Sequence, residues 1–233
     1  MAGGLGVRVA IHQPAYLPWL GYFDRIAQVD RFVFLDTVQF EKNSFINRNR
    51  IKTPQGIQWL SIPVSSRGHL NSDLSETRID NSRDWRADHL KALALNYRRT
   101  PHFAMRFARL EALYAEPEDL LSAWCWRQLR FWLDELRIST PVLRASDLDL
   151  RQRKSALVLE ICQRLGARHY VSGSLGRDYL DEASFTNAGI VVEYQAFVPR
   201  SYPQLWGEFS PGLGVVDWWF NQPESITPFR SQP

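Results

Sequence analysis

The opening stretch of the chain constrains the fold most, because an apolar run ends abruptly in a segment of chain-bending residues. The apolar run over 7–11 predicts a buried strand. Two prolines and a glycine follow it within residues 13–21. An amphipathic segment over 22–30 and a second β-forming run over 31–36 come next. This order predicts a strand, a loop, a helix and a parallel strand, the unit that builds open α/β sheets. Ligands bind such sheets at the carboxyl ends of the strands, so the loop after the first strand is predicted to be a site.

The rest of the chain adds a β-hairpin, a helical stretch and a return to alternating strands and helices. A turn signal over 53–56 predicts the hairpin, with 57–64 as its returning strand, followed by a loop over 65–76 and a short strand over 77–80. Three amphipathic helices are expected within 82–137, the first capped by Asn81 or Ser82 and carrying Leu95 on its apolar face. Strands over 141–144, 167–171 and 190–194 and a helix over 155–165 follow.

These elements predict one α/β domain over 1–233. Its centre is a mostly parallel, twisted, Rossmann-like sheet, joined by the β-hairpin, with residues 82–137 as a helical insertion or layer.

Composition and charge limit the classes of partner that the sequence indicates. The net charge of +3 comes from scattered basic residues, so charge does not indicate a nucleic-acid partner. A carrier tRNA is still compatible with this charge. The two cysteines lie in predicted helices without metal-ligand spacing, which favours a reduced, cytoplasmic protein. No apolar run approaches the ~20 residues that span a bilayer. The sequence identifies no cofactor and no metal site.

Three segments are predicted to form the walls of one site for a small or phosphorylated ligand. The first wall is the loop after the first strand, with His12, Gln13, Tyr16, Trp19 and Tyr22. The second is the end of the second strand and the amide- and base-rich segment after it, with Asp36, Gln39, Asn43, Asn47, Arg48 and Lys52. The third is the glycine- and serine-rich turn after the strand over 167–171, with Ser172, Gly173, Ser174, Gly176, Arg177, Asp178 and Tyr179.

These residue types suit the transfer of an acyl or aminoacyl group to an amine. His12 is predicted to be the general base, Asp36 to orient it, and Gln13 or Asn43 to stabilise the developing oxyanion. Arg48, Lys52 and the turn over 172–177 would clamp a phosphate. The structural alternatives stay open: His12 can satisfy backbone groups at a strand end, Asp36 can cap a loop, and the glycines can serve a tight turn.

Several motifs together resemble the WbqC-like proteins. They lie at 12–23, 34–40, 47–53, 170–180, 202–204 and 210–217, so the resemblance covers nearly the whole chain. It implies a role in bacterial surface-polysaccharide (O-antigen) biosynthesis, leaves the reaction open, and adds Tyr202 and Gln204 to the expected substrate-binding residues. A small residue such as serine is expected near Gly214.

The opening segment also resembles that of the HIGH-motif nucleotidyltransferases, whose second histidine would fall near Tyr22. That resemblance bears on fold and only weakly on mechanism.

Three functions are therefore compared. The first is a group-transfer enzyme that acts on an activated amino sugar or a related precursor. The second is a non-catalytic sugar or nucleotide-sugar binding protein, whose loop residues Tyr16, Trp19 and Tyr22 stack on sugar rings. The third is a nucleotidyltransferase-like enzyme with Mg²⁺ held by Asp36 and Asp178.

Overall fold

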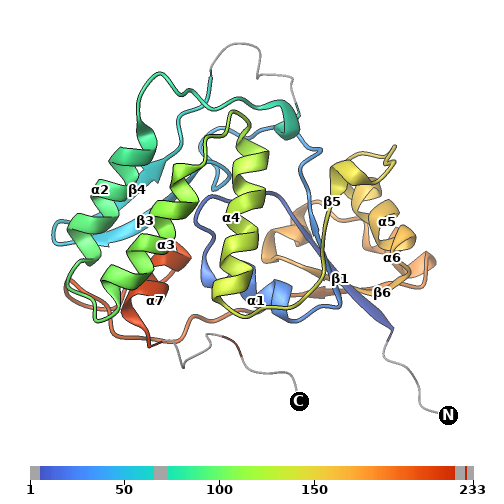
Figure 1. Cartoon of the computed structure of the whole chain (residues 1–233). Coiled ribbons are helices and arrows are strands. Elements are labelled where there is room, and N and C mark those ends of the chain that lie inside the picture. Colours follow the sequence, from blue (N-terminus) through green and yellow to red (C-terminus); the bar gives the residue numbers. More distant parts are fainter. Residues whose placement is uncertain (1–5, 66–72, 224–228, 230–233) are drawn as a thin grey trace.

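The computed structural model describes residues 6–65, 73–223 and 229, and a five-stranded parallel sheet lies at its centre (Figure 1). The strands are β1 (Val7–His12), β2 (Arg31–Phe34), β5 (Val142–Arg144), β6 (Ala167–Ser172) and β7 (Val191–Tyr194). Their spatial order is β5-β2-β1-β6-β7, and every neighbouring pair is parallel. In chain order this is 3-2-1-4-5, the Rossmann order, so the predicted α/β fold class is confirmed.

Helices cover both faces of the sheet, as the alternation of side chains along β1 requires. Val9 and Ile11 point into a buried cluster that also contains residues of α5 (Lys154–Arg164) and α6 (Glu182–Asn187). Ala10 points into a larger cluster on the opposite face, shared with α1 (Leu20–Ala27), α2 (Trp85–Tyr97), α3 (Phe103–Ala115), α4 (Leu121–Glu135) and α7 (Val215–Asn221).

The predicted hairpin is present as a separate antiparallel sheet of β3 (Arg48–Thr53) and β4 (Gly56–Ser61). Its inner face buries Asn49, Ile51 and Leu60, and α2 and α3 lie on that side of it (Figure 1). The helices over 82–137 therefore form a layer that packs on both sheets. One domain over 1–233 stays a prediction.

Several local predictions were wrong. Asp84, not Asn81 or Ser82, caps α2, because its carboxylate accepts a hydrogen bond from the N–H of Ala87 at 3.1 Å. Leu95 is 61% exposed instead of lying on the buried face of α2. The segment over 77–80 makes isolated bridges to two different partners and is not a strand. Of the loop predicted over 65–76, residues 66–72 lie outside the described residues, and Leu74–Glu76 form a 3₁₀ turn.

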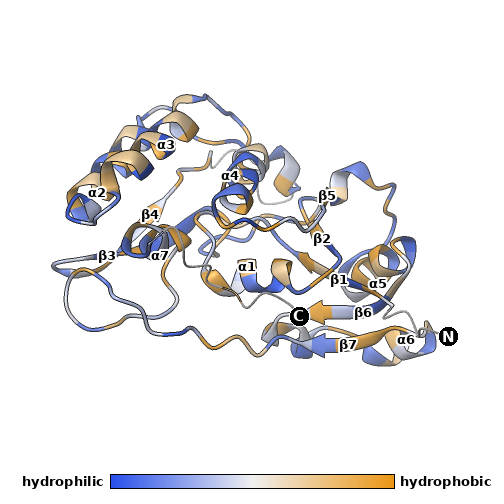
Figure 2. Cartoon of the chain, turned by 60° about the horizontal axis from the view of Figure 1, so that its bottom comes forward, coloured by the Kyte–Doolittle hydropathy of each residue, from blue (hydrophilic) through white to orange (hydrophobic). Residues whose placement is uncertain are grey.

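The segment over 195–214 connects the end of β7 to the start of α7 and runs along one side of the molecule (Figure 2). It ends at Gly214, whose N–H donates to the carbonyl of Arg50 at 2.9 Å. A Cβ added at Gly214 would lie 2.9 Å from the carbonyl oxygen of Leu17. The loop after β1, the strand β3 and the helix α7 therefore meet at a residue with no room for a side chain.

This close approach predicts that Gly214→Ser destabilises the protein, although a small residue was expected at this position. The backbone of Gly214 has φ −56°, which any residue adopts, so the cost is steric and should be about 1–3 kcal/mol of unfolding free energy. Chemical denaturation measures it, with Ser210→Ala in the same segment as the control. Equal stability of Gly214→Ser and the parent would contradict this account of the joint.

Candidate functional site

His12 ends β1 at the point where the strand order reverses. Its ring Nδ1 lies 2.8 Å from the carbonyl oxygen of Gln13. Because a carbonyl only accepts, Nδ1 must carry the proton, and Nε2 is left with a free lone pair. The rings of Trp19 and Tyr22 lie edge-on to the imidazole, with centroids 5.6 Å and 4.8 Å away. The backbone thus sets the tautomer that a general base needs.

The imidazole of His12 is neutral over the physiological pH range. Burial is the larger cause, and the charge of Arg25 is the second; together they lower the pKa of His12 to about 3. A base with this pKa is a weak one. An anion bound beside Arg25 would offset the second cause and raise the pKa of His12.

Arg25 is a buried cation near His12 that sequence analysis did not single out. Its side chain is buried on α1, and its Nε donates to Oε1 of Gln195 at 2.9 Å. None of the ion pairs formed by the described residues includes Arg25. Burial accordingly lowers the pKa of its guanidinium. A buried cation is costly unless a negative charge compensates it, so this position is suited to an anionic ligand.

The glycine after β6 makes room for this guanidinium. A Cβ added at Gly173 would lie 2.8 Å from Nη2 of Arg25. β1 and β6 are neighbours, with Ala10 opposite Val171, so His12 and Gly173 end adjacent strands. Arg25 and His12 therefore meet at the topological switch point of the sheet, where α/β proteins of this kind bind ligands.

The turn after Ser172 lies at the predicted position, and part of its predicted N–H cradle is already used by the turn itself. The N–H groups of Gly176, Tyr179 and Leu180 donate to carbonyls within the turn, so they are not available to an anion. Ser172 is buried, and a Cβ at Gly176 would lie 2.1 Å from its hydroxyl oxygen, so Gly176 serves a close approach.

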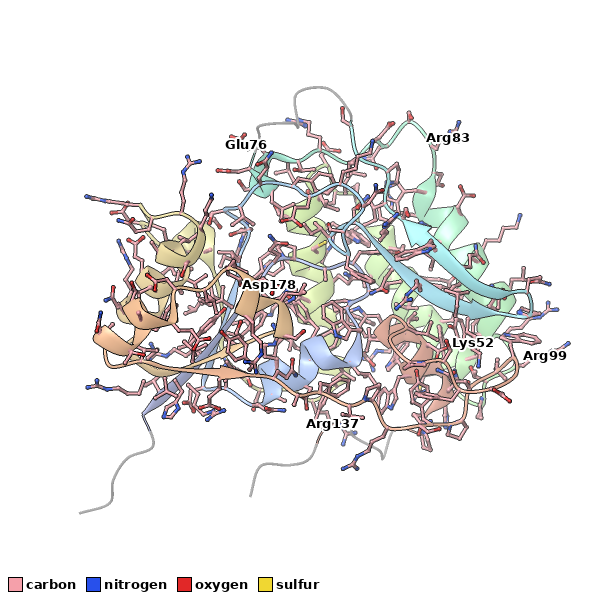
Figure 3. All side chains as sticks on the ribbon, turned by 180° about the vertical axis from the view of Figure 1, so that it is seen from behind. Lys52, Glu76, Arg83, Arg99, Arg137 and Asp178 are labelled. Atoms are coloured by element: carbon pink, nitrogen blue, oxygen red, sulfur yellow. The ribbon has the colours of Figure 1, made fainter. Side chains whose placement is uncertain are left out.

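The exposed side chains of this turn are Ser174, Leu175, Arg177, Asp178 and Tyr179. Arg177 stacks on the ring of Tyr194 at 3.9 Å. Tyr179 is close enough to Arg25 to influence its pKa. Asp178 lies well apart from Lys52 in Figure 3, so this turn and the predicted Lys52 clamp do not meet at one phosphate.

The prediction that Asp36 orients His12 was wrong. The Asp36 carboxylate is fully buried and accepts hydrogen bonds from Arg144 Nε and Nη2 at 3.0 and 2.9 Å. The backbone N–H and the hydroxyl of Ser146 complete its shell, at 2.9 and 2.8 Å. Asp36 thus joins β2 to the segment after β5, and the carbonyl of Gln13 takes over the orienting role.

Several residues expected to bind substrate have structural partners instead. The buried hydroxyl of Tyr16 bonds to Tyr114 at 2.5 Å and to His89 at 2.7 Å. Asn47 donates to the carbonyl of Ile62 at 2.8 Å.

Of the remaining members of the second wall, Gln39 and Asn43 are exposed, and the Asn43 carbonyl accepts from Arg48 at 2.5 Å.

Lys52, Tyr202 and Gln204 form a network around Asp217, a buried carboxylate that sequence analysis missed. Tyr202 donates to Oδ2 of Asp217 at 2.7 Å and Gln204 donates to it at 2.8 Å, while Tyr97 donates to Oδ1 at 2.8 Å. Lys52 donates to Oε1 of Gln204 at 3.0 Å and to the carbonyl of Glu208. This network fastens the segment over 195–214 to the hairpin and α7.

A cavity of about 420 Å³ lies between that segment and the start of α1. Its lining is largely apolar: Trp19, Leu20, Phe197, Pro199, Tyr202, Phe209, Pro211, Gly212 and Leu213. Trp19 lines the cavity and also contacts His12, so the cavity adjoins the His12 site. Aromatic walls of this kind suit a sugar ring.

Neither cysteine is suited to be a nucleophile. Both thiols are buried, and burial raises the pKa of Cys125 and Cys162, the latter to about 12. Within the described ranges, no group of three or more His, Cys, Asp and Glu side chains is placed to hold a metal ion.

The fold and this arrangement define an α/β protein with the Rossmann strand order and a candidate ligand site at the switch point of its sheet. The chain belongs to the WbqC-like protein family, whose model matches residues 13–227. The uncharacterized protein Rv1507c of Mycobacterium tuberculosis (strain ATCC 25618 / H37Rv) is 40% identical over 218 residues, which cover 92% of this chain and 93% of that protein. No solved structure matches the chain.

The family expectation drawn from the sequence motifs is thereby confirmed. No helix in the described part of the chain is long and apolar enough to cross a membrane.

His12 is predicted to stay neutral from pH 8 to pH 5. Its ring signals in NMR spectra, assigned with His12→Gln, should not shift over this range. The unfolded chain binds a proton at His12 near pH 6.5 and the folded chain only near 3, so the unfolding free energy should fall as pH drops between these values. The slope from His12 is at most about 1.4 kcal/mol per pH unit, and His89, lowered to about 4, acts with the same sign. A midpoint between pH 6 and 7 would refute this description.

The partners of Asp36 predict a structural role. Asp36→Ala leaves Arg144 without its carboxylate and should lower the unfolding free energy by about 2–3 kcal/mol, because Arg144 is partly exposed and can be rehydrated. Denaturant titration tests this, with the exposed Asp178→Ala as the matched control. If Asp36→Ala is as stable as the control, the buried pair is not what holds β2 to the segment after β5.

Proposed function

We propose that the protein is a group-transfer enzyme that acts on a negatively charged, activated amino-sugar precursor. The single observation that carries this proposal is the pairing of a neutral, tautomer-fixed His12 with a buried Arg25 that forms no direct ion pair within the described residues. A protein that only binds sugar rings needs neither feature. The family membership supports placing the reaction in bacterial surface-polysaccharide biosynthesis, and the two buried free thiols support a cytoplasmic location.

The reaction that this site suits is acyl or aminoacyl transfer to an amine. The nitrogen of the amino sugar attacks the acyl carbonyl, a C–N bond forms, and the bond from carbon to the phosphate or thiol leaving group breaks. Nε2 of His12 accepts the proton that the nitrogen loses and returns it to the leaving group. Gln13 is half-buried beside His12, and in this proposal its carboxamide donates to the oxyanion.

Arg25 has two roles in this proposal. It binds the negative charge of the precursor at the strand ends, and it couples binding to catalysis. Without the ligand, the charge of Arg25 helps to hold the pKa of His12 near 3. Once an anion pairs with Arg25, the smaller of the two causes is offset and the pKa of His12 rises, so the base gains strength when the precursor is bound.

A second function, sugar binding without catalysis, is favoured by the aromatic cavity beside Trp19. Nucleotidyl transfer with Mg²⁺ has less support, because the Asp36 oxygens assigned to the metal already accept from Arg144 and Ser146.

The test is an amide-forming assay on nucleotide-linked and phosphorylated amino sugars, with acyl-phosphate, acyl-thioester and aminoacyl donors, read by mass spectrometry of the product. His12→Gln should lower kcat by roughly 10²- to 10⁴-fold. Arg25→Met should raise KM and also lower kcat, since the charge coupling is lost. Arg31→Met, an exposed arginine at the start of β2, is the control.

The binding-protein alternative predicts a different pattern. The parent protein would bind a precursor in the cavity and consume none of it, and His12→Gln would bind it with the same affinity. That outcome would end the enzyme proposal.

A further inference from the structure

The outer face of the hairpin carries positive charge and aromatic rings that the His12 site does not use. Residues alternate along β3, so Asn49 and Ile51 are buried while Arg48 and Arg50 point outward. Trp59 lies opposite Arg50 on β4 and is 43% exposed. α2 and α3 lie on the other side of the hairpin (Figure 1), and the segment over 195–214 contacts this face at Lys52 and Arg50 while Trp59 stays exposed.

Three aromatic rings connect this face to the His12 site. Phe45 lies 5.7 Å from Trp59 and 5.7 Å from Trp19, measured between ring centroids. Phe45 is 39% exposed, and Ile57, two residues before Trp59 on β4, is 45% exposed. Neighbouring large apolar side chains exposed in this way mark interaction surfaces in soluble proteins.

The two arginines lie on these rings without a carboxylate partner. The guanidinium carbon of Arg48 is 4.5 Å from the centroid of Trp59, and that of Arg50 is 5.6 Å from the same ring. Neither arginine takes part in an ion pair formed by the described residues. The Nε atoms of both are buried and have no hydrogen-bond partner. An arginine held on a ring in this way presents its remaining donors to an anion.

We propose that Phe45, Trp59, Arg48 and Arg50 form a binding site for a nucleotide. A nucleobase stacks on the exposed rings, and its phosphates bind the two guanidinium groups. A neutral glycan would use the rings and leave both charges uncompensated. A free phosphate would use the charges and leave the rings exposed. A nucleotide satisfies both.

The position of this site relative to the cavity favours a nucleotide that carries a sugar. Nη2 of Arg50 donates to the carbonyl of Gly212 at 2.8 Å, and Gly212 lines the cavity. Trp19 lines the same cavity and touches both Phe45 and His12. A sugar linked to the phosphates would therefore enter the cavity beside His12. This inference rests on the proposed function and names its substrate class, a nucleotide-linked sugar.

The test is direct titration of the full-length protein with UDP, dTDP and ADP. Binding is measured by calorimetry and by tryptophan fluorescence. Saturable binding of at least one nucleotide is expected. Trp59→Ala should weaken it about tenfold, as loss of one base–aromatic stack does, and Arg48→Ala and Arg50→Ala should weaken it by a similar factor. Trp59→Phe should retain most of the affinity. The matched control is Arg86→Ala, because Arg86 lies over Trp85 at 5.4 Å on α2, away from the hairpin.

Two further arms identify the source of the nucleotide. Inorganic phosphate should compete only weakly, because it cannot stack. A short single-stranded RNA is the second competitor. If it binds much more tightly than the mononucleotides and loses affinity in the same three alanine variants, the assignment of a nucleotide-linked sugar as the ligand is overturned, while the nucleotide site is retained. Folded protein that binds no nucleotide at millimolar concentration, or variants that bind as the parent does, would overturn the site itself.

Failure here is distinguishable from failure of the proposed reaction. The titration needs no turnover, so amide formation on a phosphorylated amino sugar without a nucleotide would preserve the reaction even if no nucleotide binds. Conversely, nucleotide binding on the hairpin with no turnover of any precursor would preserve this site and remove the reaction.

Discussion

The buried N–H and carbonyl groups of the loop after β1 need hydrogen-bond partners inside the protein. The side chains that provide these partners fix most of the architecture. Gln128 of α4 accepts from the N–H of Leu17 at 2.9 Å and donates to the carbonyl of Ala15 at 3.3 Å. Asn49 of β3 donates to the carbonyls of Tyr16 and Leu17, at 3.2 and 2.7 Å. Buried amide and carbonyl groups without partners would each cost about 1–3 kcal/mol. One loop therefore fixes the positions of the helical layer and the hairpin relative to the sheet.

In the candidate site, the buried charge of Arg25 is held by hydrogen bonds and only partly compensated by Asp24. Arg25 is held by Gln195, whose Nε2 in turn donates to the carbonyl of Gly21 at 2.9 Å. The carboxylate of Asp24 accepts from Gln195 at 2.6 Å but forms no ion pair with Arg25 within the described residues. The free energy lost in burying Arg25 is thus available to be recovered when an anion binds.

Sequence reasoning predicted the elements whose signal is local. The apolar runs and the turn over 53–56 predicted the central strands and the hairpin, and the βαβ order predicted a parallel sheet with His12 at a strand end. Sequence reasoning failed where a side chain can form hydrogen bonds with several partners that are distant along the chain. Asp36 follows β2 as predicted, yet its bonds go to Arg144 and Ser146, more than a hundred residues away along the chain. No spacing rule distinguishes that choice from a bond to His12.

Arg25 was missed for a related reason, although a signal existed. In a helix over 20–27 it lies three residues after Tyr22 and one before Ile26, so it belongs to the buried stripe. Basic residues are almost never fully buried without a partner, and a stripe that contains one therefore indicates a ligand or an ion pair.

On the hairpin the signal is the period of two that places Arg48, Arg50 and Lys52 on one face of β3. Residues 204–208 of the segment over 195–214 cover Lys52, whereas the guanidinium of Arg50 meets that segment at the carbonyl of Gly212. The site thus depends on where the segment over 195–214 ends its contact with the hairpin, a property of the tertiary structure that β3 alone does not encode. Its anchor is Asp217, whose carboxylate has a raised pKa because burial outweighs its three donors and the charge of Lys52. The conformation of this segment therefore links the cavity wall at Tyr202 to the charge left exposed on the hairpin.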